Sequence, residues 1–285
     1  MAGTGRTIIV PGATLNVGNA VGVNLTTRTL ENGGTILWTS GFISMAGAVI
    51  TNRAGALFEN LGAGGLEWNG GASRIDNTGI LRKAVHTGTM NISSSVAFNN
   101  YGTVEILNGI LAVNGGYTPS ASAVLKCAIS GNTPGTGYGR LQVGNTATLA
   151  GALSVILTNG FVPATNDLFT VLTAGTRNGT FANFSYPSNA VTMQMSNTAN
   201  SVLVRVTGIS AVPQPLLLPP EISGTDVTLI WTALSNTTYR VEFKSDVNST
   251  NWNALSGDVI GVSNIASKVD ALMPTNRFYR VRIIP

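Results

Sequence analysis

The sequence of 285 residues is poor in charge. Lys, Arg, Asp and Glu together make up 10% of it, whereas about 25% is typical of globular proteins. Sixteen basic and twelve acidic side chains leave a net charge of +4, and the densest basic point is only the stretch LRK at 81–83. Because nucleic-acid binding needs cations clustered along one face, this scattered charge argues against a nucleic-acid partner.

Histidine and cysteine are represented by one residue each, His86 and Cys127. Catalytic triads and metal centres need several converging nitrogen, sulfur or carboxylate groups, and the segment KAVHTGTMN around His86 offers no carboxylate. Cys127 lies in the apolar run AVLKCAIS, which is typical of a buried, inert thiol. The sequence therefore predicts no metal, no cofactor and no catalytic residue.

Long apolar runs are also absent. No stretch of about 18 apolar residues could span a membrane, so we expect no membrane span. The N-terminal segment MAGTGRTIIV lacks the charged and apolar regions of a signal peptide. If the protein is secreted or held at the cell surface, as we predict below, its signal is not in this chain.

Glycine is abundant, with 34 residues, and short strand-like runs such as TILWTS (35–40) and TVEIL (103–107) end at Gly or Asn. Most of these runs alternate apolar and polar residues, which is the pattern of a half-buried strand. Residues 1–208 contain no stripe with the 3.6-residue period of a helix. The pattern predicts an all-β protein.

A short motif recurs along this region as LENGG (30–34), ITNRAG (50–55), IDNTG (75–79) and FNNYG (98–102). Its asparagines are Asn32, Asn52, Asn77 and Asn100. Recurrence every 20–25 residues without intervening helices favours a right-handed parallel β-helix, in which each asparagine bonds to its equivalent in the next turn. In this interpretation the apolar residue before each asparagine faces the core and the following glycine supplies a positive φ. The alternative is that Asn-x-Gly is ordinary turn chemistry of any all-β protein.

The composition changes near VPQPLLLPP (212–220). We predict a β-helix over 1–208, a Pro-rich linker over 209–220 and a small antiparallel β-sandwich over 221–285, where alternating strands are richer in charge and aromatics. At roughly 22 residues per turn, the first part would have about nine turns.

Three tracts resemble known proteins. FNNYGTVEILNGILAVNGGYT (98–118) resembles the repeats of bacterial surface and autotransporter-type β-helix proteins. Residues 137–184 are similar to the segment that often ends such helices in secreted proteins of the Verrucomicrobia and Planctomycetes type. The tail, with VTLIWTALSNTTYRVEFKSD (227–246) and RFYRVRI (277–283), resembles a fibronectin-III-like module. The resemblance implies a surface or secreted protein with a structural or adhesive role.

Four aromatic residues fall near the expected corners among Asn, Thr and Gly: Trp38, Trp68, Tyr101 and Tyr117. Aromatic faces flanked by amides and hydroxyls are suited to holding sugars, so these four residues are candidate glycan contacts. The competing interpretation, slightly favoured for Trp38 and Trp68, is that these rings fill the core.

The sequence thus predicts a non-enzymatic extracellular or cell-surface protein that displays a polar surface to glycans or cells. One alternative is a self-assembling filament subunit, because β-helix ends expose strand edges and TIIV (7–10) is an apolar run near one end. The other is a polysaccharide-active enzyme, which requires either paired carboxylates or a Ca²⁺ cluster with an Arg or Lys base. The best constellation for that chemistry is Glu59 and Asp76 near Arg74 and Arg82.

Overall fold

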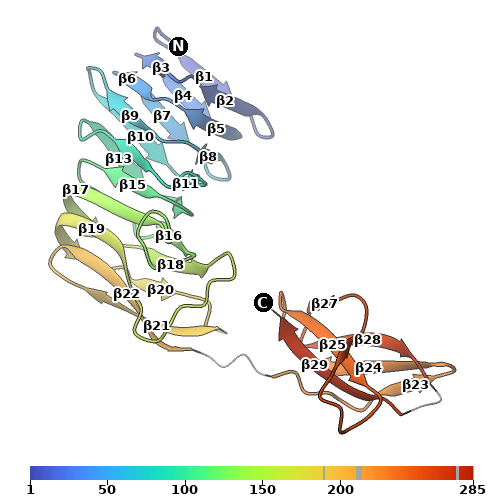
Figure 1. Cartoon of the computed structure of the whole chain (residues 1–285). Coiled ribbons are helices and arrows are strands. Elements are labelled where there is room, and N and C mark those ends of the chain that lie inside the picture. The colour runs from blue at the N-terminus through green and yellow to red at the C-terminus, as the bar shows by residue number, and fades with distance from the viewer. Residues whose placement is uncertain (189, 210–213, 274–275, 285) are drawn as a thin grey trace. The chain divides into compact units, whose positions relative to one another are not determined.

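The computed structural model describes residues 1–188, 190–209, 214–273 and 276–284. The chain divides into two compact units, Met1–Ser210 and Ala211–Pro285. Both are built from strands. The described residues contain no helix, and therefore no helix long and apolar enough to cross a membrane. The predicted all-β fold is confirmed: a parallel β-helix is followed by a small antiparallel, sandwich-like part (Figure 1).

Three sheets wrap around the core of the first unit. Sheet 1 has five parallel strands, in the order β1 (Arg6–Ile9), β4 (Thr29–Asn32), β7 (Val49–Asn52), β10 (Ser73–Asn77) and β13 (Val96–Asn100). Sheet 2 contains β2 (Thr14–Gly18), β5 (Thr35–Ser40), β8 (Leu57–Asn60), β11 (Ile80–Lys83), β14 (Thr103–Ile106), β16 (Val124–Ile129), β18 (Ala152–Leu157) and β20 (Asn183–Ser185). Sheet 3 contains β3 (Val23–Thr26), β6 (Ile43–Ala46), β9 (Gly64–Trp68), β12 (Thr89–Ile92), β15 (Ile110–Val113), β17 (Arg140–Leu149), β19 (Leu168–Gly179), β22 (Ser201–Ile209) and β21 (Val191–Asn197).

Each of the first five turns gives one strand to each sheet, so equivalent residues stack directly (Figure 1). The apolar residues of the recurring motif form one such column, in which Leu30, Ile50, Ile75 and Phe98 are paired in register and buried. Side chains alternate between the two faces of a strand, so this register keeps the same positions inside at every turn. Burial of each large apolar side chain stabilises the stack by about 1.5–3 kcal/mol.

The predicted number of about nine turns is wrong. Five three-stranded turns are followed by two longer turns without a strand in sheet 1, and β19, β22 and β21 then pair antiparallel. Ten-residue connections at 114–123, 130–139 and 158–167 take up the chain that the estimate assigned to further turns. A constant repeat length therefore overestimates the number of turns.

The glycines of the motif play a different role from the predicted one. A positive φ is found at Gly55, at 80°, but not at Gly34, Gly79 or Gly102. A Cβ atom at position 79 would lie 2.3 Å from the carbonyl oxygen of Arg53, in the turn before. Equivalent clashes of 2.3 Å with carbonyl oxygens would occur at positions 34 and 102. These glycines are needed because successive corners approach too closely for a side chain.

The second unit has two antiparallel sheets. One contains β23 (Glu221–Ser223), β24 (Asp226–Thr232) and β28 (Ile265–Ala271); the other contains β25 (Thr238–Lys244), β26 (Asn253–Ala254), β27 (Val259–Ile260) and β29 (Phe278–Ile284). Trp231 and Tyr239 lie in its core, with ring centroids 5.9 Å apart. Residues 216–218, within the predicted linker, pair with β24 through Leu217 and Trp231, so this part of the segment belongs to the second unit.

Candidate functional site

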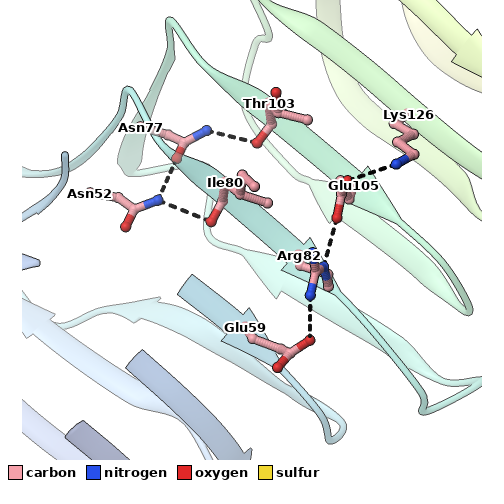
Figure 2. A network of polar contacts seen from close by, with 8 residues as sticks. All are labelled: Asn52, Glu59, Asn77, Ile80, Arg82, Thr103, Glu105 and Lys126. Atoms are coloured by element: carbon pink, nitrogen blue, oxygen red, sulfur yellow. Dashed lines mark hydrogen bonds and ion pairs between the residues drawn. The ribbon is translucent and has the colours of Figure 1, made fainter. Parts of the chain in front are cut away.

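The four motif asparagines form a continuous ladder inside the first unit, part of which Figure 2 shows. The side-chain nitrogen of Asn32 donates to the side-chain oxygen of Asn52 at 2.8 Å, Asn52 donates to Asn77 at 2.7 Å, and Asn77 donates to Asn100 at 2.8 Å. All four side chains are at most 1% exposed. The ladder ends where Asn100 donates to the hydroxyl of Tyr117 at 3.1 Å.

The amides of Asn32, Asn52 and Asn77 also bond to the backbone. The second N–H of Asn52 donates to the Ile80 carbonyl at 3.0 Å, and that of Asn77 donates to the Thr103 carbonyl at 3.1 Å (Figure 2). Asn32 donates to the Leu57 carbonyl in the same way. A buried amide that lacks partners costs about 1–3 kcal/mol, and in Asn32, Asn52 and Asn77 both N–H groups and the oxygen are used. The ladder ties the corner between sheets 1 and 2 to its neighbours, and its burial keeps it out of reach of a ligand.

Two of the predicted glycan contacts lie in the core and cannot touch a glycan. Trp38 and Tyr117 are fully buried. Trp38 donates its indole N–H to the Ser40 carbonyl at 3.0 Å and packs on Phe58. Tyr117 accepts the last ladder bond and stacks on Phe98 with ring centroids 5.9 Å apart, and burial raises the pKa of its hydroxyl.

The other two predicted contacts, Trp68 and Tyr101, are 48% and 50% exposed. Trp68 borders a cleft of about 390 Å³ on sheet 3 together with Phe42, which is 46% exposed. Phe42 was not among the predicted contacts because it lies just before β6, outside the alternating pattern of a strand. Its position at a corner between strands accounts for its exposure. Tyr101 is not among the residues that line this cleft.

Charged side chains on the outside of sheet 2 form a row of ion pairs. Arg82 contacts Glu59 at 3.2 Å and Glu105 at 2.6 Å, and Lys126 contacts Glu105 at 3.1 Å (Figure 2). Burial alone would raise the pKa of Glu105, but hydrogen bonds from Arg82 and Lys126 outweigh it and lower that pKa. Glu105 is therefore ionised at neutral pH and is a poor proton donor.

The constellation predicted for polysaccharide cleavage is not brought together. Glu59 lies on β8 of sheet 2, whereas Asp76 lies on β10 of sheet 1. Asp76 bonds to Arg74 at 2.8 Å and accepts a hydrogen bond from Asn99 at 2.7 Å. Both carboxylates are thus engaged by different neighbours.

A lysine and an asparagine are buried at neighbouring positions inside the first unit. Lys83 is 1% exposed and lies in register with Asn60, which is fully buried. The ammonium group donates to the carbonyls of His86 at 2.5 Å and Gly62 at 3.3 Å. Burial lowers the pKa of Lys83 to about 8. Lys83 lies two residues after Leu81 along β11, so strand alternation could have identified it as an inward-facing residue.

The single histidine and the single cysteine have structural surroundings. His86 is exposed, and its Nδ1 accepts a hydrogen bond from the Gly88 N–H at 2.9 Å. Cys127 is buried, and burial raises the pKa of its thiol to about 12. Within the ranges that the structure describes, no three His, Cys, Asp or Glu side chains converge as they would around a metal ion.

The chain matches no protein-family model, and no curated protein sequence matches it either. The fold and the geometry described above are therefore the basis for a functional assignment.

Proposed function

We propose that this protein is a non-enzymatic structural or adhesive protein of the cell surface or extracellular space. Its first unit would be a stiff β-helical scaffold that displays polar surface to glycans or neighbouring cells, and its second unit would be a spacer or attachment module. The observation that carries the proposal is the buried asparagine ladder. Its four polar side chains hydrogen-bond successive turns to one another, which suits a rigid scaffold.

The outer charges support the same proposal. Glu31 contacts Arg6 and Arg53, and Glu59 and Glu105 share Arg82. A catalytic carboxyl needs a protonation state suited to its task and access to a substrate, whereas these carboxylates are held by arginines. The resemblance to bacterial surface β-helix proteins adds the extracellular location, which is part of the proposal.

A direct test is to incubate the purified full chain with insoluble cellulose, chitin and mannan. We expect the protein to sediment with at least one polysaccharide while the soluble fraction gains no reducing ends. Release of sugars that the Glu59→Gln and Glu105→Gln double variant abolishes would instead support the polysaccharide-active alternative. Sedimentation with none of the polysaccharides would contradict the glycan part of the proposal.

One observation favours the filament alternative. In the part of the chain that the structure describes, β1 and β2 pair with a neighbour on one side only. A cleft of about 340 Å³ opens at this end over Leu15, Val17 and Leu25. Exposed strand edges beside apolar surface invite pairing with another chain.

Electron microscopy and light scattering of the full chain over a range of concentrations test this alternative. Fibres that disappear in Leu15→Lys, with unchanged circular dichroism, would support a filament subunit. A monomer at every concentration would exclude it.

A further inference from the structure

The cleft on sheet 3 is bordered by two aromatic rings at opposite ends. Phe42 lies just before β6, and Trp68 ends β9, opposite Met45 in the neighbouring strand. Three residues along a strand cover about 10 Å, so the backbone positions of Phe42 and Trp68 are offset by roughly that distance along the sheet. Both are about half exposed, at 46% and 48%, and Val21, which also lines the cleft, is 81% exposed.

The surroundings make room for the ring of Phe42 and orient the ring of Trp68. A Cβ atom at Gly22 would lie 2.6 Å from the ring of Phe42, so this ring can lie over the backbone only because residue 22 is glycine. The indole N–H of Trp68 donates to the Gly71 carbonyl at 2.8 Å, which fixes the orientation of that ring. Preorganised aromatic surfaces bind with a smaller entropic cost than mobile ones.

Polar side chains occupy the floor between the rings. Asn24, Ser44 and Glu67 are paired in register on three successive strands, and Asn69 lies beside Trp68. Within the described ranges, none of these four side chains makes a hydrogen bond or ion pair to the protein. The floor therefore presents unused amide, hydroxyl and carboxylate groups.

Glycine also sets the position of Glu67. A Cβ atom at Gly65 would lie 2.5 Å from one carboxylate oxygen of Glu67, so the side chain lies back over this glycine along the sheet. Glu67 is the one charged residue that lines the cleft, and within the described residues no cation pairs with it. An anionic ligand would be repelled, whereas a ligand with hydroxyl groups could donate hydrogen bonds to it.

From this arrangement we propose that the Phe42–Trp68 cleft is a binding site for a short stretch of a neutral polysaccharide. Aromatic rings at the ends would stack on the C–H faces of sugar rings, and the polar floor would bond to their hydroxyls. A purely apolar partner would leave the four polar groups of the floor without partners, which is costly. The assignment rests on the proposed adhesive role and gives it a place and a ligand class.

The test uses the full chain and a panel of immobilised oligosaccharides: cellohexaose, chitohexaose, mannohexaose and hexagalacturonic acid. We expect the wild-type protein to bind at least one neutral member and not the acidic one. Trp68→Ala and Phe42→Ala should each weaken this binding by about tenfold or more, since each loses a stacking surface. Trp68→Phe should keep most of it, because the ring remains.

Phe278→Ala is the control, since this exposed aromatic residue of β29 neither lines the cleft nor belongs to the predicted glycan contacts. It should bind like the wild type, and circular dichroism should show that all variants are folded. If the wild type binds an oligosaccharide and the Trp68→Ala and Phe42→Ala variants bind it equally well, this site is wrong while the adhesive role stands. If the wild type sediments with insoluble polysaccharides but binds no oligosaccharide, the ligand assigned to this cleft is wrong. Binding neither would overturn the site and the role together.

Discussion

At the scale of single residues, this protein places polar side chains where most folds place apolar ones. Burying an amide without hydrogen-bond partners is costly, and in the ladder each asparagine supplies partners to the next. Removing one asparagine therefore lowers the free energy of unfolding in part because it leaves polar groups unpaired in the two neighbouring turns.

Asn77→Ala tests this reasoning. The substitution removes the oxygen that accepts the hydrogen bond from Asn52. It also removes the N–H groups that donate to the side-chain oxygen of Asn100 and to the Thr103 carbonyl. We expect the free energy of unfolding of the first unit to fall by about 2–4 kcal/mol, measured by urea denaturation followed by circular dichroism. Thr78→Ala, at the neighbouring exposed position, is the control and should change it by less than about 0.5 kcal/mol. Equal effects of the two substitutions would contradict the role of the ladder.

Lys83 gives the first unit a pH dependence whose sign can be worked out. Its pKa is about 8 in the folded protein and about 10.4 in an unfolded chain. Between these values the unfolded state binds more protons, so the contribution of Lys83 to the free energy of unfolding rises with pH. Below pH 8 the lysine is protonated in both states, and the free-energy cost of burying its charge does not change with pH. Lys83 contributes a gain of up to about 3 kcal/mol across this window, whereas the buried Cys127 thiol, whose pKa is raised to about 12, contributes an opposing loss above about pH 8.5, so the Lys83 contribution is measured as the difference between the wild type and Lys83→Met. The gain should be absent in Lys83→Met, and equal pH profiles for the two proteins would refute the interpretation.

At the scale of elements, the corners determine how closely successive turns can stack. Gly79 and Gly55 each end a copy of the recurring motif but lie at different places in the corner, since the pairing of Ile80 with Leu57 aligns Gly79 with Ala56. Gly79 faces backbone carbonyl oxygens of the preceding turn, whereas Gly55 has a φ of 80° and open space around its Cα. Steric exclusion and conformational strain can therefore be compared within one repeat.

Gly79→Ala should destabilise the first unit by about 2–4 kcal/mol, because the backbone must move to admit a methyl group. Gly55→Ala should cost only about 1 kcal/mol, the price of a left-handed conformation for alanine. Urea denaturation of both variants measures the difference. A larger loss for Gly55→Ala would show that φ, and not space, governs these corners.

The sequence predicted the sheets well where its pattern repeats and poorly where the repeat changes. The column of Leu30, Ile50, Ile75 and Phe98 follows from the motif alone, because one residue per turn faces the core in register. The longer turns after residue 113 carry no such motif, so their length was not predictable from the period.

The aromatic residues show a second limit. Trp38 follows Ile36 in the inward phase of β5, so strand alternation could have identified it as a core residue. Trp68 breaks the alternation of β9, where Leu66 is buried but residues 67 and 68 are both exposed. The cleft that joins Trp68 to Phe42 depends on the register of two turns, which local sequence does not specify.

At the scale of the whole molecule, the low charge and the paired arginines suit contact with uncharged polymers. If the glycans bound are neutral, electrostatic attraction contributes little, and binding should change less than about twofold between low salt and about 1 M salt, where the Debye length is about 3 Å. Polysaccharide sedimentation at several salt concentrations measures this. A steep fall with salt would indicate an anionic partner instead.

If the asparagine ladder makes the first turns of the β-helix one stiff scaffold, their strands should open together. Amide hydrogen exchange of the full chain, read by mass spectrometry, measures this. We expect β7, β10 and β13 to exchange together and slowly in the wild type, and Asn77→Ala to accelerate all three while leaving the second unit unchanged. If these strands exchange at unrelated rates in the wild type, or if the substitution leaves them unaffected, the ladder does not hold the scaffold together.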